Sequence, residues 1–187
     1  MTRLARRAFL GAAASLPLAF AAEPARATLL RGLPLPALVA RSHQVLVLSA
    51  LESHCRYADI GGRRAIVTET LLQVSEVVQQ ISPGPSRVTV RTLGGVLDGV
   101  GELVHGQAEF APHAACLAFL VAAPDGSLWV TGMAQGHYPL TTADGEPALS
   151  ASPHLPKLVD FEHSAVRALV RQRLSSARRL VLEASAR

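Results

Sequence analysis

The stretch RRAIVTETLLQVSEVVQQ, at residues 63–80, constrains the fold of this chain more than any other part of the sequence. Apolar or β-branched residues alternate here with polar ones, among them Glu69, Gln73 and Ser75. A period of two predicts a long strand with one buried face. A helix over 69–80 is the competing interpretation, but the density of β-branched residues favours the strand.

Other β-rich runs surround this stretch. The run at 43–51 predicts the first strand, and Asp59-Ile60-Gly61-Gly62 predicts a turn after it. The continuously apolar run at 114–122 is typical of a strand that is buried on both faces. Three shorter strands are also expected. One lies at 87–92, the next begins directly after the turn Pro124-Asp125-Gly126, and the last lies at 136–140. The segment 93–113 is rich in glycine and is expected to be irregular.

Five to six such strands predict a mainly β protein, either a small OB-like barrel or a bent sandwich, with a C-terminal amphipathic α-helix. Residues 160–183 show helical spacing of apolar residues, with Asp160 as the expected N-cap. The chain is accordingly divided into five segments: a signal peptide at 1–27, a lead-in at 28–42, the β-barrel domain at 43–140, a linker at 141–157 and the C-terminal helix at 158–187.

The first 27 residues have the composition of an export signal. Positive charge precedes a modestly apolar run, and the pattern Arg6-Arg7-Ala8-Phe9-Leu10 resembles a twin-arginine signal. A general secretory signal with an incidental arginine pair is the alternative. Ala25-Arg26-Ala27 fits the small-x-small rule for cleavage after Ala27, and cleavage after Ala21 is the second choice. We therefore expect a periplasmic or secreted protein.

The charge of the chain is concentrated outside its predicted barrel. The formal net charge is +4, but the first 27 residues hold four arginines and one glutamate, which leaves the mature chain near +1. Residues 28–156 are acidic, and residues 157–187 are basic. With aromatic residues at only 4%, no basic, aromatic face is expected, and nucleic acid is not an expected partner.

The order of the segments LVARSHQVLVLSAL, TETLLQVSEVVQ, VTVRTLGG, HGQAEFAPHAACLAFLVA and GMAQGHYPL, over about 37–140, resembles a family of exported bacterial β-barrel (OB-like) proteins of uncharacterised activity. The resemblance implies export and a barrel core, and it implies no chemistry. The sequence departs from the family pattern at Pro112-His113-Ala114-Ala115, where the family has a Gly-Glu turn. Cys55 and Cys116 are not part of the family pattern either.

Histidines and cysteines supply the candidate metal ligands. The soft-ligand set consists of His54, Cys55, His113, Cys116 and His137, with Met133 beside them, and it would suit copper or zinc. The spacing matches no established metal motif. The competing interpretation is a disulfide between Cys55 and Cys116, which an exported compartment permits.

No pattern of catalytic residues stands out. Glu102 and Glu109 flank the glycine-rich segment and are expected to be solvated loop acids. We therefore expect a non-enzymatic binding or structural module of the cell envelope, and the alternative is a periplasmic metal-binding protein or metalloenzyme. Membrane contact is expected only through the signal peptide, with surface contact by the C-terminal helix as a weaker possibility.

Overall fold

A computed structural model describes residues 29–80, 86–143 and 145–186, so the expected export signal, with Arg6, Arg7, Phe9, Leu10 and the cleavage residues Ala25 and Ala27, lies outside the described residues. The strands are β1 (Leu30–Arg31), β2 (Gln44–Ile60), β3 (Arg63–Gln80), β4 (Arg87–Leu93), β5 (Gly95–Leu97), β6 (Val100–Glu102), β7 (Ala115–Ala122), β8 (Leu128–Val130), β9 (His137–Ala143), β10 (Glu146–Leu149) and β11 (Leu158–Val159). The helices are α1 (Leu35–Ala40), η1 (Met133–Gly136), η2 (Phe161–His163), α2 (Ala165–Leu169) and α3 (Leu174–Ser185).

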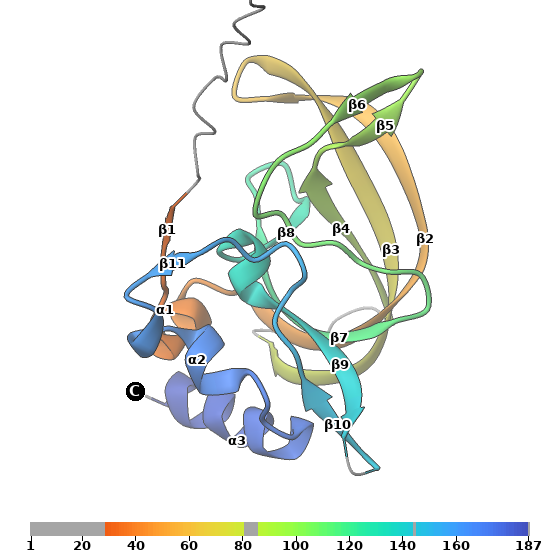
Figure 1. The fold of residues 1–187 in the computed structure, drawn as a ribbon. Coiled ribbons are helices and arrows are strands. Elements are labelled where there is room, and N and C mark those ends of the chain that lie inside the picture. Colours follow the sequence, from red (N-terminus) through yellow and green to blue (C-terminus); the bar gives the residue numbers. More distant parts are fainter. Residues whose placement is uncertain (1–28, 81–85, 144, 187) are drawn as a thin grey trace, which may run out of the picture.

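Five strands pair in a closed circuit (Figure 1). The circuit runs β2–β3–β4–β8–β7 and returns to β2, so the strands neighbour one another in the chain order first, second, third, fifth and fourth. The pairing of β4 with β8 is parallel, and the other four pairings are antiparallel. This arrangement confirms the prediction of a mainly β, barrel-like fold. β9 and β10 extend the sheet beyond β7.

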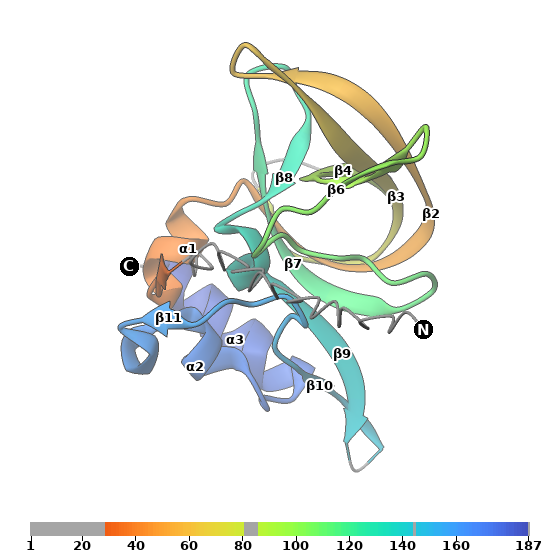
Figure 2. The same cartoon turned by 45° about the horizontal axis from the view of Figure 1, so that its top comes forward.

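β2 and β3 form one long hairpin that bends over the rest of the sheet (Figures 1 and 2). β3 spans the whole of residues 63–80, which confirms the strand and excludes the helix. The first strand, expected to end at 51, continues to Ile60 because its polar residues pair in register with β3 as far as Ile60↔Arg63. A bulge between Ala50 and Glu52 marks where β2 leaves the barrel. We call the part beyond this bulge, residues 52–71, the arm.

Both faces of β7 are buried, as the apolar run at 114–122 predicts, and so are both faces of β2 over residues 45–50, because these strand segments separate two hydrophobic clusters. The first cluster, which we call the barrel interior, consists of Leu46, Leu48, Ala50, Leu72, Val88, Val90, Ala108, Phe110, Cys116, Ala118 and Leu120. The second cluster, which we call the outer core, lies between the sheet and the helices. It contains Leu35, Leu38, Val39, Val45, Val47, Leu117, Phe119, Tyr138, Leu149, Leu158, Ala165, Val166, Leu169, Leu174, Ala177 and Val181.

The prediction of one helix over 160–183 is wrong, because the chain forms η2, α2 and α3 instead. Asp160 adopts a left-handed conformation, and Ser164 caps α2 by accepting a hydrogen bond from the Arg167 N–H. The break between α2 and α3 is stabilised by β10. The Arg171 N–H donates to the Leu149 carbonyl at 2.8 Å, and the Leu149 N–H donates to the residue 172 carbonyl at 2.9 Å. Pairing with a strand edge therefore replaces helical hydrogen bonds here.

The segments expected as lead-in and linker both take part in the fold. The lead-in contains β1 and α1, and the linker contains the end of β9 and all of β10. β1 pairs in parallel with β11, which joins Leu30 to Leu158. Within the described ranges, none of the helices has the length and apolar character needed to cross a membrane.

Candidate functional site

The inner face of the arm is lined with hydroxyl groups. Ser53 and Thr70 lie opposite each other on β2 and β3, and their hydroxyl oxygens are 3.0 Å apart. The Thr68 hydroxyl donates to the carbonyl of Gly94 at 2.8 Å, and Thr92 lies opposite Thr68 on β4. Because residues that face each other across antiparallel strands share one face of the sheet, these four side chains form a polar floor.

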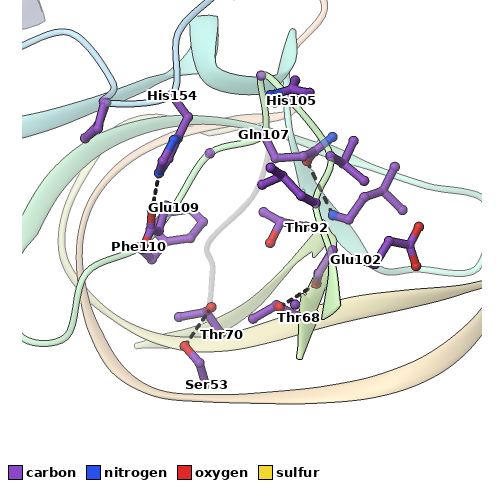
Figure 3. Close-up of a pocket in the computed structure, with 18 of the residues that line it drawn as sticks. Ser53, Thr68, Thr70, Thr92, Glu102, His105, Gln107, Glu109, Phe110 and His154 are labelled. Carbon is purple, nitrogen blue, oxygen red and sulfur yellow. Dashed lines mark hydrogen bonds and ion pairs between the residues drawn. The ribbon is translucent and has the colours of Figure 1, made fainter. Parts of the chain in front are cut away.

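The chain between β4 and β7 crosses over this floor and forms a roof (Figure 3). The Glu102 carboxylate accepts a hydrogen bond from the Ile66 N–H at 2.7 Å, which fixes the roof to β3. At the other end, the His113 N–H donates to the Ala50 carbonyl at 3.0 Å. The roof is therefore held to both strands of the hairpin.

Gly95 allows the roof to begin close to the arm. Its φ of +135° is a conformation that other residues rarely adopt. A Cβ at this position would lie 2.6 Å from the Cys55 sulfur and 2.7 Å from the Thr68 hydroxyl oxygen. Any side chain here would push β5 away from the floor and open the enclosure.

A cavity of about 580 Å³ lies between floor and roof. Residues 153–156 line it on one side, where the Nε2 of His154 is hydrogen-bonded to the Glu109 carboxylate of the roof (Figure 3). The charged side chains of its lining are the carboxylates of Glu102 and Glu109, while none of its described lining residues is a lysine or arginine. Its apolar lining comprises Leu93, Leu103, Val104, Phe110, Pro112, Pro153, Leu155 and Pro156. The cavity thus offers hydrogen bonds, apolar contact and negative charge.

A second chamber of about 230 Å³ adjoins the first and shares Glu109 and Phe110 with it. Cys116 and His137 line this chamber. Burial raises the pKa of the Cys116 thiol to about 12. Burial also lowers the pKa of His137 to about 4, against the opposing effect of Glu109, so its imidazole is neutral at pH 7. The ring packs edge-on against Phe110, and its Nδ1 lies 3.2 Å from the Ser152 hydroxyl.

The outer face of the arm carries a network of charges instead. Glu69 lies at its centre, 2.6 Å from Arg56 Nη2, 2.8 Å from Arg91 Nη2 and 3.2 Å from His54 Nε2. Hydrogen bonds from Arg56 and then Arg91 lower the pKa of Glu69 to about 2, although burial acts in the opposite direction. Arg91 also forms an ion pair with Asp125 at 2.9 Å. The network joins three strands of the barrel to the turn before β8.

The five predicted metal ligands do not form one cluster. His54 lies on the outer face of β2 beside Glu69, and Cys55 lies on the inner face beside Thr68. His113 is exposed at the end of the roof, whereas Cys116 and His137 share the second chamber. Neighbouring residues of a strand point to opposite faces, which separates His54 from Cys55. Among the described residues, no three His, Cys, Asp or Glu side chains are grouped to hold a metal ion.

The predicted disulfide between Cys55 and Cys116 is wrong, because both thiols are free. Cys116 pairs in register with Leu48, seven positions before Cys55 on β2. At about 3.3 Å per residue, that separation is roughly 20 Å along the strand. A disulfide needs Cα atoms within about 7 Å of each other. The two cysteines were expected to lie close together, but β2 continues beyond its apolar run and carries Cys55 away from Cys116.

Sequence reasoning missed most of the cavity residues. Glu102 and Glu109 were expected in solvent; Glu109 is exposed, as expected, and Glu102 is half-buried, but both also line the cavity, which the sequence did not predict. The signal that could have identified the floor is in β3, where Thr68 and Thr70 occupy the same face as the buried Leu72. Hydroxyl groups on the core face of a strand indicate a polar cavity, because buried hydroxyls need hydrogen-bond partners.

No protein-family model matches the sequence, and no curated protein shows significant similarity to it.

Proposed function

We propose that this protein is an exported binding module of the cell envelope, periplasmic or secreted, that holds a small neutral or cationic ligand in the cavity under the arm. The observation that carries the proposal is the open cavity of about 580 Å³ between a hydroxyl floor and a tethered roof. Concave sites with apolar walls and a few directed polar groups are the usual form of a small-molecule site.

The charges of the cavity define the class of ligand. Glu102 and Glu109 contribute negative charge, whereas Arg56 of the arm and Arg91 of β4 are bound to Glu69 on the opposite face of the sheet. An anionic ligand would be repelled by the carboxylates without a lysine or arginine in the lining to receive it. A ligand with hydroxyl, amide or ammonium groups beside an apolar part matches both the floor and the prolines of the wall.

The hydrogen-bond partners of the cavity favour binding over catalysis. Ser53 bonds to Thr70 and not to an imidazole, and His154 bonds to Glu109 without a hydroxyl or thiol partner. Ser152 does contact His137, but both are buried, and no described carboxylate bonds to the other ring nitrogen. A nucleophile needs a base within hydrogen-bond reach and a third group that orients the base.

Native mass spectrometry of protein recovered from the exported compartment tests the proposal. We expect a bound species of fixed mass that is released on denaturation. Ser53→Phe would fill the cavity from its exposed floor position and should abolish the adduct. Glu52→Phe is the matched control, because this neighbouring residue points to the other face of the arm and should retain it.

Three results would contradict the proposal. The first is the absence of any adduct under native conditions, and the second is equal loss of the adduct in the Ser53→Phe and Glu52→Phe proteins. The third is sustained turnover of the recovered compound by purified protein. Each would exclude a non-enzymatic binding site here.

The proposed export is tested separately. Retention of the full chain in the cytoplasm after Arg6→Lys and Arg7→Lys would support export through the twin-arginine signal. Unchanged export would contradict that route.

A further inference from the structure

The outer edge of β2 has no partner strand along the arm in the described part of the chain (Figures 1 and 2). The pairing of β2 with β7 ends at Ser49, and Ala50 forms an isolated bridge with Pro112. Beyond the bulge, residues 52–60 pair with β3. We call the side of β2 that faces away from β3 over residues 53–59 the free edge. It contains no proline or lysine, the residues that commonly protect an exposed edge from further pairing.

The hydrogen bonds of Ile66 establish how the backbone groups of the free edge are directed. Ile66 lies opposite Tyr57 on the arm. Its N–H donates to Glu102 and its carbonyl accepts from Gly94, so both groups point away from β2. Opposed residues of an antiparallel pair either exchange both hydrogen bonds or exchange neither. Tyr57 therefore directs its own N–H and carbonyl away from β3, and alternate residues do the same because the register is regular over 52–60.

Ser53 and Cys55 share this direction with Tyr57, so each presents an N–H and a carbonyl on the free edge. Over the described ranges, the backbone groups of Ser53 and Cys55 have no hydrogen-bond partner there. The Tyr57 carbonyl accepts a bond of 3.3 Å from the Arg56 guanidinium. A row of backbone donors and acceptors at alternate residues is complementary to the backbone of an extended peptide.

The cavity reaches the free edge at Ser53. This residue is exposed, it lines the cavity, and its hydroxyl belongs to the floor. A residue of an added strand that exchanged backbone hydrogen bonds with Ser53 would carry its side chain on the same face of the sheet. That side chain would lie over the floor and under the roof. The cavity is therefore in the position of a side-chain pocket for a strand added to this edge.

The charge of the cavity matches a cationic side chain. Glu102 and Glu109 line it, and its described lining contains no lysine or arginine. The hydrogen-bond partners of these carboxylates are the Ile66 N–H and the His154 imidazole. Within the described ranges, neither carboxylate forms an ion pair with a lysine or arginine that would cancel its charge.

The arginines of the arm are directed elsewhere. Arg56 and Arg63 lie on the outer face, where Arg56 forms its ion pair with the central glutamate of the network. Arg64 lies at the tip of the arm, opposite Asp59, and its Cζ is 3.8 Å from the centroid of the Tyr57 ring. Negative charge in the cavity is thus available to a ligand.

A second copy of the chain would not supply the matching charge. Two copies joined through their free edges would exchange hydrogen bonds among the residues whose backbone groups point outward, Ser53, Cys55, Tyr57 and Asp59. The side chain placed beside Ser53 would then be a hydroxyl, a thiol, a phenol or a carboxylate. None of these is a cation, so a separate peptide is the better fit.

We propose that the ligand of the cavity is an extended peptide segment, which adds to the free edge as a further strand and places a lysine or arginine side chain in the cavity beside Ser53. Backbone hydrogen bonds to Ser53 and Cys55 supply affinity that is independent of sequence. Glu102 and Glu109 select the cationic side chain. The inference rests on the proposed function, since it concerns the same cavity, and it names the chemical class of the ligand.

Methylation of the peptide backbone tests the strand pairing. The probe is a fluorescein-labelled Thr-Val-Lys-Val-Thr amide, and its binding to the purified full chain is measured by fluorescence anisotropy. N-methylation of the lysine removes the N–H that bonds to the Ser53 carbonyl, and it should weaken binding by about tenfold or more. N-methylation of the valine after the lysine is the matched control. The N–H of that valine faces away from β2, so affinity should change by less than about twofold.

Substitution of charge tests the pocket. A peptide with glutamate in place of lysine should bind at least about tenfold more weakly, because the carboxylates of the cavity repel it. Glu109→Gln should weaken binding of the lysine peptide by about threefold. Glu52→Gln is the matched control, because Glu52 lies beside the free edge on the outer face, and it should leave the affinity unchanged.

Several results would overturn the proposal. They are no binding of the lysine peptide, equal effects of the two methylations, and equal affinity for the lysine and glutamate peptides. Tandem mass spectrometry of the species that copurifies with the protein separates this inference from the proposed function. A peptide containing lysine or arginine would support both, whereas a non-peptide compound displaced by Ser53→Phe would overturn this inference and leave the cavity as a binding site.

Discussion

The outer core and the barrel interior share β2 and β7, but they end in different ways. Val45 and Val47 point into the outer core, which helices close on the side away from the sheet. Leu46 and Leu48 point into the barrel interior, which continues past Ala50 into the hydroxyl floor of the arm. The difference teaches that helices seal one cluster, whereas the other cluster leads into the cavity under the arm.

Loss of a large side chain in the outer core should give the largest effect. Phe119 is fully buried there, and Phe119→Ala should lower the free energy of unfolding by about 3–5 kcal/mol because a cavity forms that helices and sheet cannot fill. Urea unfolding measures this change. Phe161→Ala removes the same group from the surface and should cost less than about 0.5 kcal/mol. A similar loss of unfolding free energy in the Phe119→Ala and Phe161→Ala proteins would show that the outer core does not stabilise the fold more than the surface does.

Acid should lower the free energy of unfolding because of the buried His137. The pKa of this buried imidazole is lowered to about 4, from 6.5 for an ordinary histidine, so the unfolded chain binds a proton that the folded chain does not. Stability is therefore complete above pH 6.5 and falls by about 3 kcal/mol as the pH drops to 4. Unfolding curves from pH 7 to 4 measure the slope. His137→Gln does not titrate and should flatten it; an unchanged slope would assign the effect to other groups.

Glu69 should contribute less, and in a lower pH range. Its pKa is lowered from 4.5 to about 2, so its contribution is present above pH 4.5 and is lost as the pH falls towards 2. Glu69→Gln should cost about 2 kcal/mol at pH 7, because Arg56 and Arg91 lose a charged partner. The same comparison at pH 2 should show little difference. A cost independent of pH would point to packing instead of charge.

The smallest effect on stability is expected at the floor of the cavity. Thr70→Val keeps the shape of the side chain and removes the hydroxyl that bonds to Ser53, so unfolding should change by about 1 kcal/mol or less. The affinity for the bound species should nevertheless fall, by roughly tenfold or less. Native mass spectra would show this as a lower occupancy of the cavity. Unchanged occupancy would show that the Thr70 hydroxyl does not contact the ligand. The contrast between the two clusters would then be one of packing and not of ligand binding.

The sequence predicted the strands that bury at least one apolar face. β3 was recognised from its alternation, and β7 from its continuous apolar run, because burial of one or two faces leaves a direct mark on composition. The continuation of β2 beyond residue 51 was missed, since Ser53, His54 and Cys55 are polar or small on both faces. Pairing with β3, and not hydrophobic burial, holds this part of the strand.

The site was beyond prediction because its parts are distant in the chain. The floor lies near residues 53 and 70, the roof near 102–112 and the closing wall at 153–156. No local pattern brings Glu109 to His154 or Cys116 to His137, since these contacts depend on how the strands are ordered around the barrel. The five predicted metal ligands were placed in one set for the same reason: residue types were counted without knowledge of the faces on which they lie.

The parallel pairing of β1 with β11 has a consequence for the order of folding. Leu30 pairs with Leu158, so the first strand has no partner until most of the chain has been synthesised. The β2–β3 hairpin, in contrast, joins residues close in sequence and can form early. Docking of the N-terminal segment is therefore a late event that reports completion of the fold. Hydrogen exchange at the Gly32 N–H, which donates to the Val159 carbonyl at 2.7 Å, would follow this last step directly.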